Sequence, residues 1–349
     1  MILYRHTINL EEPISAAMQK MNEPQHLRII FVLNEWKQVI GSITDGDIRR
    51  GLLKGLNTNT SCENFAFKDF KFINADDINI SSLQHYKESG IFVLPVLNSS
   101  KELLKIINFN SQISYLPLSA VIMAGGFGNR LRPLTITTPK PMLTVGDLPI
   151  LEINIKRLVQ FGIHDIVICV NYLKNQIINY FGDGSKWNCE ITYIEENEPL
   201  GTIGALSLHE NFKYNDILLF NADLLSTINL EDMYLKYQAT ASDLIIAGIP
   251  HKITLPYAVL EQSMNRIVHI SEKPTYTYFS NAGFYIFSNR LTHIIPKNTF
   301  FNATDFVEEL IKKDHVVTSY EIFGYWNDIG SIEDYEKSNI DILSLNLFQ

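Results

Sequence analysis

Between residues 118 and 249, short apolar runs alternate with segments that have helical spacing. The expected strands are 118–123, 166–170, 190–194, 217–220 and 244–249, and the expected helices lie around 151–159, 174–181 and 230–238. Nearly continuous apolar strands are typical of a parallel sheet covered on both faces. We therefore expect an α/β domain over 118–349, with a mostly parallel sheet that binds its ligand beyond the carboxyl ends of its strands.

The pattern before residue 115 is different, and it occurs twice. Helix 14–21, strands 28–33 and 39–43 and helix 47–53 are expected first, followed by helix 81–89 and strands 91–96 and 103–107. The two strand pairs lie about 60 residues apart, as expected for repeated units that bury their faces against each other. We expect an α+β tandem over 1–114, with repeats of about 1–60 and 61–114 and a short linker before residue 118.

Composition excludes several classes of protein. The chain is 46% hydrophobic and 19% charged, so it can bury sizeable cores and is not disordered. Its formal net charge of −9 makes it a poor general binder of nucleic acid or of anionic membranes. We therefore expect no nucleic-acid or membrane partner, although a local cationic pocket for one phosphorylated small molecule remains compatible with this charge.

The cysteines and the start of the chain favour a cytoplasmic protein. Cys62, Cys169 and Cys189 are odd in number and have no CxxC spacing, so we expect reduced thiols and no zinc site. The first six residues lack the apolar region of a signal peptide. Apolar runs such as 29–33 are far shorter than the ~20 residues that a helix needs to cross a bilayer.

A glycine-rich segment directly follows the first strand of the α/β domain. It reads Ala-Gly-Gly-Phe-Gly-Asn-Arg-Leu-Arg-Pro-Leu-Thr over 124–135, with Pro-Lys-Pro-Met-Leu over 139–143. Gly125, Gly126 and Gly128 allow close backbone approach and aim N–H groups at phosphate oxygens. Arg130 and Lys140 add positive charge, so we expect a phosphate-binding loop.

Two familiar loop types do not fit this spacing. A Walker loop requires Gly-Lys-Ser/Thr, which is absent, and a dinucleotide fingerprint requires a glycine where Leu131 stands.

Asp223 follows the apolar strand 217–220, which places a carboxylate at the carboxyl end of a buried strand. Mg²⁺ prefers one or two carboxylates together with phosphate oxygens and water. An Asp at this position also suits a helix cap or a turn.

Over about 118–349 the chain resembles the sugar-1-phosphate nucleotidylyltransferases. The resemblance implies a Rossmann-like fold and a reaction in which an NTP and a hexose 1-phosphate give an NDP-sugar and pyrophosphate. It implies charge stabilisation by Arg130 and Lys140, and Mg²⁺ binding by Asp223 and by Asp328 in Trp-Asn-Asp-Ile-Gly. Asn129 stands where the family often has Thr or Ser, and its amide can still donate to the triphosphate.

The same resemblance assigns further binding residues. Pro199 to Leu206 resembles the base-binding turn, which implies nucleotide binding by Gly201 and Thr202. The sugar phosphate is expected to contact residues in three motifs, Pro-Tyr-Ala-Val, Glu-Lys-Pro and Asn-Ala-Gly. These residues are Tyr257, Glu272, Lys273 and Asn281.

The N-terminal repeats resemble a CBS pair, also called a Bateman module. The resemblance rests on Gly-Ser-Ile-Thr-Asp-Gly-Asp-Ile-Arg-Arg over 41–50, and it implies that Thr44 and Asp47 contact AMP or ATP. A hydroxyl can donate to phosphate, and a carboxylate can accept from ribose hydroxyls. The second repeat has Asn108 and Ser111 at the equivalent positions. A purely structural or dimerising module is the alternative.

The fusion of the two modules resembles bacterial guanylyltransferases of the mannose-1-phosphate type, which make activated sugars for surface glycans. We therefore expect GTP as the nucleotide and a self-associating enzyme, with adenine nucleotides as regulators. UTP, CTP and dTTP remain open as substrates. A catalytically degenerate adenine-nucleotide sensor is the alternative from another class.

Overall fold

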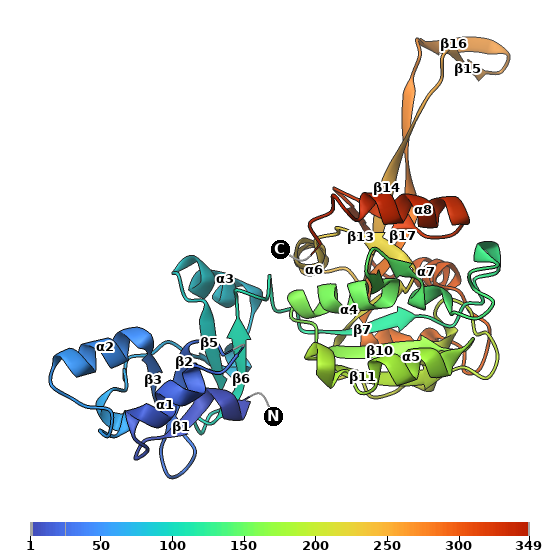
Figure 1. Ribbon diagram of the computed structural model, residues 1–349. Helices are drawn as coiled ribbons and strands as arrows, with labels where there is room; N and C mark the ends of the chain where they lie inside the picture. The colour runs from blue at the N-terminus through green and yellow to red at the C-terminus, as the bar shows by residue number, and fades with distance from the viewer. Residues whose placement is uncertain (1–2, 25, 348–349) are drawn as a thin grey trace. The chain divides into compact units, whose positions relative to one another are not determined.

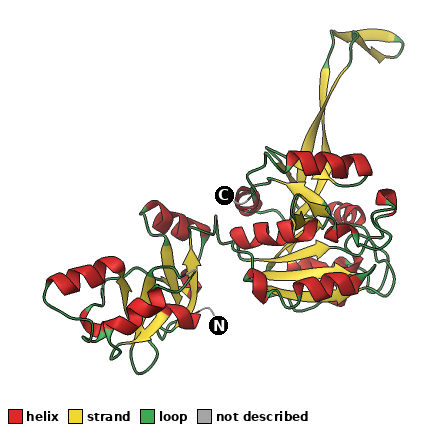
Figure 2. Cartoon of the chain, in the orientation of Figure 1, coloured by secondary structure: helices red, strands yellow, loops and turns green. Residues whose placement is uncertain are grey.

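The computed structural model describes residues 3–24 and 26–347, and the chain divides into two compact units (Figures 1 and 2). The first unit is Met1–Tyr115 and the second is Leu116–Gln349. No helix within the described part of the chain is both long and apolar enough to span a bilayer.

The N-terminal unit contains the same strand arrangement twice. Its first half comprises β1 (Thr7–Asn9), α1 (Ile14–Met21), β2 (Ile29–Leu33), β3 (Val39–Thr44) and α2 (Asp45–Leu53). Its second half comprises β4 (Ile73–Asn74), α3 (Ile80–Glu88), β5 (Val93–Leu97) and β6 (Leu103–Asn108). In each half the first strand pairs in parallel with the second, and the second pairs antiparallel with the third. The two halves therefore share one strand topology, in which the predicted strand pairs are present and β1 and β4 are additions that the sequence pattern did not predict.

The two halves of this unit pack against each other. Phe31 and Val39 from the first half share a buried apolar cluster with Leu97 from the second. The N–H of Val39 donates to the carbonyl of Lys101 across the same contact, at 2.9 Å. Each three-stranded sheet thus buries an apolar face against the other half of the unit, and this burial stabilises both sheets.

The C-terminal unit is built on a seven-stranded sheet with the order β11-β10-β7-β12-β17-β14-β18. The sheet strands are β7 (Leu118–Met123), β10 (Asp165–Val170), β11 (Glu190–Glu195), β12 (Asp216–Asn221), β14 (Leu244–Thr254), β17 (Thr275–Ser288) and β18 (Val317–Glu321). The first four strands in the order are mutually parallel, and only the pairs formed by β17 are antiparallel. The expected mostly parallel α/β sheet is confirmed.

The unit's remaining helices and short strands lie outside this sheet. They are β8 (Thr144–Val145), β9 (Leu148–Pro149), α4 (Ile150–Gln160), α5 (Lys174–Phe181), β13 (Leu224–Ser226), α6 (Leu230–Ala239), β15 (Val259–Ser263), β16 (Arg266–Ser271), α7 (Ala303–Lys312), β19 (Trp326–Asp328) and α8 (Ile332–Asp341). Consecutive residues of β7, Ala120, Val121 and Ile122, are all fully buried. Because successive side chains point to opposite faces, both faces of the sheet are covered.

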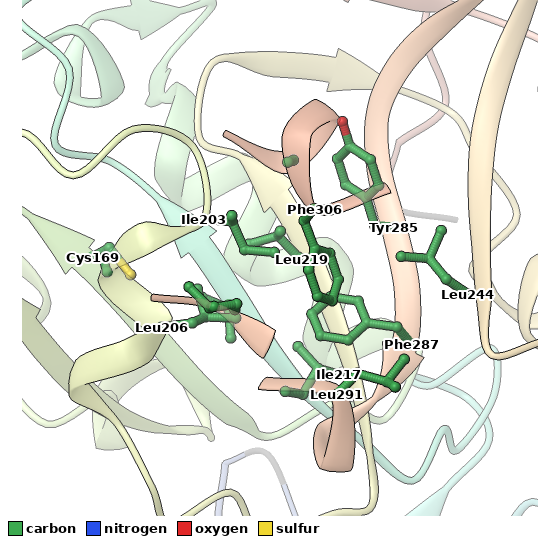
Figure 3. Close-up of a cluster of buried hydrophobic side chains, with 14 of the residues drawn as sticks. Cys169, Ile203, Leu206, Ile217, Leu219, Leu244, Tyr285, Phe287, Leu291 and Phe306 are labelled. Carbon is green, nitrogen blue, oxygen red and sulfur yellow. The ribbon is translucent and has the colours of Figure 1, made fainter. Parts of the chain in front are cut away.

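Figure 3 shows the core beneath one face of the sheet. Phe306 of α7 packs edge to face on Phe287 of β17, with ring centroids 5.3 Å apart, and Ile217 and Leu219 of β12 lie in the same cluster. This packing fixes the strands whose carboxyl ends form the candidate site.

Two strands of the sheet continue beyond it as an arm, defined here as residues 250–281. The β14–β17 ladder runs without a break in pairing from Gly248↔Asn281 to Thr254↔Thr275, and β15 and β16 form a hairpin at its far end (Figure 1). Nearly every residue of the arm is exposed. The sequence analysis predicts strand 244–249 before the arm and does not predict that this strand extends beyond the sheet.

Candidate functional site

Four parallel strands deliver polar residues to one edge of the sheet. Gly125 follows β7, Asn171 follows β10, Glu196 follows β11 and Asp223 follows β12. Neighbouring strand ends are joined by hydrogen bonds, because the Asn171 amide donates to the Glu196 carbonyl at 3.1 Å. Carboxyl ends of parallel strands meet at the same edge, so this edge is where a ligand site is expected.

A cavity of about 360 Å³ opens at this edge. The residues that line it come from the glycine-rich loop, the ends of β7, β11 and β12, the turn after β11 and the start of α7. They are Met123, Ala124, Gly125, Gly126, Phe127, Lys140, Pro141, Glu196, Pro199, Gly201, Thr202, Asn221, Ala222, Asp223, Phe300 and Asn302.

The glycine-rich loop folds back onto the segment that carries Lys140. Gly128 has a φ of +62°, and a Cβ there would lie 2.9 Å from Cγ2 of Thr135 and 3.2 Å from Cβ of Lys140. The Thr135 hydroxyl donates to the Gly128 carbonyl at 2.8 Å. A side chain at 128 is therefore excluded twice, by conformation and by space. At Gly126, by contrast, a Cβ would meet no heavy atom within 4 Å.

Lys140 lies between two carboxylates. Its Nζ donates to Oδ2 of Asp223 and is 4.0 Å from Oδ1 of Asp328. The side chains of Lys140 and Asp223 are only 12% and 22% exposed, whereas that of Asp328 is 45% exposed, so the Lys140–Asp223 pair is the more shielded part of the cluster. Oδ1 of Asp223 and Oδ1 of Asp328 are buried and have no hydrogen-bond partner. Two buried acceptors therefore face the site without a donor.

Backbone pairing holds the second carboxylate beside the first. Leu224 pairs with Asp328 in the β13–β19 ladder, and the N–H of Ile329 donates to the carbonyl of Asp223 at 3.2 Å. The Arg130 guanidinium lies against Gly330, where a Cβ would be 3.2 Å from Nη2. Arg130, Lys140, Asp223 and Asp328, widely separated in sequence, thus meet at one place.

The surroundings of Asp328 alter its acidity. Burial raises the pKa of this carboxyl above its ordinary value, and the charge of Asp223 raises it further. Lys140 and Arg130 act in the opposite direction and lower the same pKa. The charged form of Asp328 is therefore stabilised by nearby cations and destabilised by its burial and by Asp223.

The two carboxylates suit a divalent metal that brings other ligands with it. Within the described residues, no group of three or more His, Cys, Asp or Glu side chains could hold a metal alone. Mg²⁺ is commonly bound by one or two carboxylates plus phosphate oxygens and waters. The unpartnered oxygens of Asp223 and Asp328 fit that pattern, and their role as metal ligands remains a prediction.

A second wall of the cavity is formed by the segments around Leu200 and Phe301, which are joined to each other by backbone hydrogen bonds. The N–H of Phe301 donates to the carbonyl of Leu200 at 2.9 Å. Gly201 has a φ of +82°, and a Cβ there would lie 2.5 Å from the Phe301 carbonyl oxygen. The Thr202 hydroxyl accepts from the N–H of Ala303 at 2.8 Å, which satisfies a free donor at the start of α7. Gly201 and Thr202 therefore shape this wall.

Glu196 is a cavity residue that the sequence analysis did not select. It is 5% exposed, and its Oε2 accepts from the N–H of Leu200 at 2.9 Å. Burial raises the pKa of its carboxyl, and the Leu200 N–H partly opposes that shift. Its place two residues after the predicted strand 190–194 is the signal that could have identified it. Asn221, Phe300 and Asn302 were missed as well.

The structure does not bring the expected sugar-phosphate residues to the cavity wall. Tyr257 is 79% exposed on the arm, and Glu272 and Lys273 lie in the turn before β17. Asn281 is at the base of the arm, where its amide donates to the Tyr285 hydroxyl at 2.6 Å. The uninterrupted β14–β17 ladder carries the first three residues away from the sheet. Asn129 is exposed at the start of a short 3-10 helix, Asn129–Leu131.

Thr44 and Asp47 have structural partners in the N-terminal unit. Oδ2 of Asp47 accepts from the backbone N–H and the hydroxyl of Thr44, at 2.9 and 2.6 Å, which caps the start of α2. Oδ1 of Asp47 accepts from Arg50 at 2.6 Å. This cap explains both residue types without a ligand. Nucleotide binding by Thr44 and Asp47 remains a prediction.

Comparison with known proteins agrees with the geometry of the C-terminal unit. The profile of a family described as "Nucleotidyl transferase" matches residues 119–344. The chain belongs to this family. The match includes Arg130, Lys140, Asp223 and Asp328, so the cavity lies within the nucleotidyl transferase domain.

Curated relatives of this nucleotidyl transferase act on sugar phosphates. The chain is 30% identical over 233 residues to mannose-1-phosphate guanylyltransferase of Mycobacterium tuberculosis, covering 65% of each chain. It is 28% identical over 232 residues to glucose-1-phosphate thymidylyltransferase of Streptomyces griseus, covering 64% of this chain and 65% of the relative. The chain thus spans about 65% of the length of these relatives.

Solved structures share the fold. HddC from Yersinia pseudotuberculosis, complexed with GMP-PN, superposes with a TM-score of 0.51 at 26% identity, covering 64% of this chain and 99% of that one. A glucose-1-phosphate thymidylyltransferase from Bacillus anthracis gives a TM-score of 0.54 at 23% identity, covering 66% and 96%. The latter likeness shows the α/β fold of the nucleotidyl transferase unit.

Proposed function

We propose that the C-terminal unit is a sugar-1-phosphate nucleotidylyltransferase. In this reaction an oxygen of the sugar phosphate attacks the α-phosphorus of an NTP, and the bond from that phosphorus to pyrophosphate breaks. The observation that carries the proposal is the meeting of Lys140, Asp223 and Asp328 beside the glycine-rich loop. A phosphate monoester is already anionic near pH 7, so the reaction needs no general base.

The residues of the site would act mainly by positioning and by charge. Backbone N–H groups of Gly125 and Gly126 would bind phosphate oxygens, and Arg130 and Lys140 would stabilise charge that develops on the leaving pyrophosphate. Asp223 and Asp328 would hold Mg²⁺, which neutralises phosphate charge when it is bound. The ion pair with Asp223 keeps Lys140 at the loop before a triphosphate arrives.

We propose GTP as the nucleotide because of Glu196. A carboxylate can accept from both N1–H and the 2-amino group of guanine, whereas uracil and thymine offer one ring N–H between two carbonyls. Glu196 is buried on the cavity wall between the glycine-rich loop and the turn at Leu200. The guanylyltransferase relatives and the GMP-PN complex of HddC support the same base. A mannose-like hexose 1-phosphate would be the second substrate.

The test is a pyrophosphate-release matrix of four NTPs against several hexose 1-phosphates, with Mg²⁺ present. We expect GTP to give the highest kcat/KM. Glu196→Gln should lower kcat/KM for GTP by about 10- to 100-fold, since a good bidentate base contact is worth about 1–3 kcal/mol of discrimination. Glu195→Gln is the matched control, because Glu195 is exposed and pairs with Lys174 at 2.6 Å. No release with any NTP would refute the proposed activity, and an unchanged base preference in Glu196→Gln would refute the base assignment.

We also propose that the N-terminal unit is a CBS pair that tunes a cytoplasmic enzyme of surface-glycan synthesis through AMP or ATP. Its support is the duplicated sheet topology and the motif at Thr44 and Asp47. Millimolar AMP or ATP should raise the melting temperature or change the rate of the full chain. If neither nucleotide changes either quantity, the unit has a structural role only.

A further inference from the structure

The arm, residues 250–281, exposes an unusual amount of apolar surface. Eleven of its large apolar side chains are each more than one-third exposed, namely Ile253, Leu255, Tyr257, Leu260, Met264, Ile267, Val268, Ile270, Tyr276, Tyr278 and Phe279. Their summed exposed area is on the order of 1,000 Å², and it is divided between the two faces of the ribbon, because consecutive residues such as Tyr278 and Phe279 project from opposite faces. It is close to the ~800 Å² that each partner buries in a stable protein–protein interface.

A ribbon of this kind is not expected to persist uncovered in water. The arm has only two strands, and isolated two-stranded hairpins are marginally stable at best. Its unpaired strand edges also invite pairing with another chain. Burial of the arm against another surface would therefore be favourable.

The arm's apolar residues are sorted by face at its tip. Leu260 and Ile270 lie directly opposite each other in the β15–β16 ladder, so they project from the same face. The next pair, Glu261 and His269, projects from the other face. The pair Leu260 and Ile270 thus marks one apolar face at the tip, and Glu261 and His269 make the opposite face more polar.

The arm's own domain is not placed to receive it. The ladder continues straight from the sheet through the pairs Gly248↔Asn281 to Thr254↔Thr275, a reach of ~20 Å at ~3.3 Å per residue. Folding back over the cavity of the same chain would require both strands to break their pairing. A second copy of the chain can meet the extended arm without that loss.

Charge favours the same partner. The arm carries three cationic residues, Lys252, Arg266 and Lys273, against two carboxylates, so its net charge is +1. Since the whole chain has a net charge of −9, the remainder carries −10. A cationic arm is attracted to the acidic body of another copy.

We propose that two copies of this chain exchange arms, so that each supplies Glu272 and Lys273 to the sugar-phosphate side of the other's cavity. The apolar face with Leu260 and Ile270 would pack on the partner's body, and a two-fold axis would make the two contacts equivalent. This inference rests on the proposed function only for the role of Glu272 and Lys273, which is the sugar-phosphate binding that the sequence resemblance implies. The association itself is tested independently of activity.

The first experiment measures the mass of the full chain in solution by light scattering or sedimentation. We expect a dimer. A shortened variant in which an Asn-Gly turn joins Thr254 to Thr275, whose hydroxyls are 2.9 Å apart, should be monomeric. Ile270→Glu should also dissociate the dimer, whereas His269→Glu, one residue away on the opposite face, should not. A monomeric wild type, or a dimer that survives in both the shortened variant and Ile270→Glu, would overturn the proposal.

The second experiment tests whether each arm contributes to the cavity of its own chain or to the cavity of the other copy. Lys140→Ala damages the cavity and Lys273→Ala damages the arm. Co-expression with two different tags isolates the heterodimer, in which arm exchange creates one intact site of two. It should show about half the wild-type rate of pyrophosphate release, while each homodimer is strongly impaired.

A heterodimer as impaired as its parents would mean that each arm serves its own chain, which overturns the exchange. If wild type releases no pyrophosphate, the proposed function fails, but the mass measurements still decide whether the arms associate.

Discussion

Replacing Lys140 by Met should reveal how strongly the site depends on a cation between its carboxylates. Lys140 is 12% exposed and Asp223 22%, so removing the lysine leaves carboxylate charge in a poorly solvated place. Breaking a buried pair costs about 3–5 kcal/mol, and partial exposure here favours the lower end, about 3 kcal/mol. For a unit of this size, that corresponds to a fall in Tm of roughly 6–12 °C without divalent cations.

Mg²⁺ should restore more of the Tm in Lys140→Met than in wild type, because it replaces the missing positive charge beside Asp223 and Asp328. The kcat/KM for pyrophosphate release should fall by roughly 10²–10³, as for loss of one charge-stabilising donor. Scanning calorimetry with and without Mg²⁺ measures the first effect. Lys297→Met is the control: its partner Glu210 is 3.0 Å away and both side chains are about three-quarters exposed, so the change should be within about 1 kcal/mol. An unchanged Tm and rate in Lys140→Met would refute the reasoning.

Three further outcomes are expected. Asp223→Asn should raise the Mg²⁺ concentration for half-maximal rate by at least roughly tenfold, which a metal titration measures, since even indirect contacts to a metal ligand are worth 10–100-fold. Gly128→Ala should lower stability by about 1–2 kcal/mol because of its positive φ, whereas Gly126→Ala should leave the Tm unchanged. Asp216→Asn should stabilise the protein at pH 7, since burial raises the pKa of Asp216 above its ordinary value of 3.8 and so penalises its charged form. That difference should vanish as the pH falls below 3.8, where Asp216 is protonated in both states, and a gap that persists at low pH would contradict the explanation.

The strands of the central sheet were predictable because both of their faces are buried. Runs such as 118–123 and 217–220 are apolar at nearly every position, and this pattern has few interpretations other than a covered strand. The position of Asp223 was predictable for a related reason, since it closely follows a strand at the carboxyl edge of that sheet, whereas Lys140 lies well beyond the end of β7 and was selected from its motif.

The arm and Glu196 were harder to predict for physical reasons. Residues in the arm include Ile267, Val268 and Ile270, which are apolar like core residues, so composition does not distinguish an exposed ribbon from a buried strand. The expected sugar-phosphate residues were assigned to a shared pocket from their motifs alone, and motifs do not state the direction in which a hairpin projects. Glu196 was overlooked because a buried carboxylate is uncommon, and only its neighbours in space explain it.

The wall formed by Leu200 and Phe301 has a consequence for how this enzyme can evolve. Its two segments are joined by main-chain bonds, which any residue except proline can make at a donor position. Phe300 and Asn302 face the cavity, whereas Phe301 between them packs towards the core. Substitutions at Phe300 and Asn302 can therefore change the side chains that face the ligand without breaking the main-chain hydrogen bonds between the two segments. A lineage can in this way acquire a new nucleotide preference while its fold is retained.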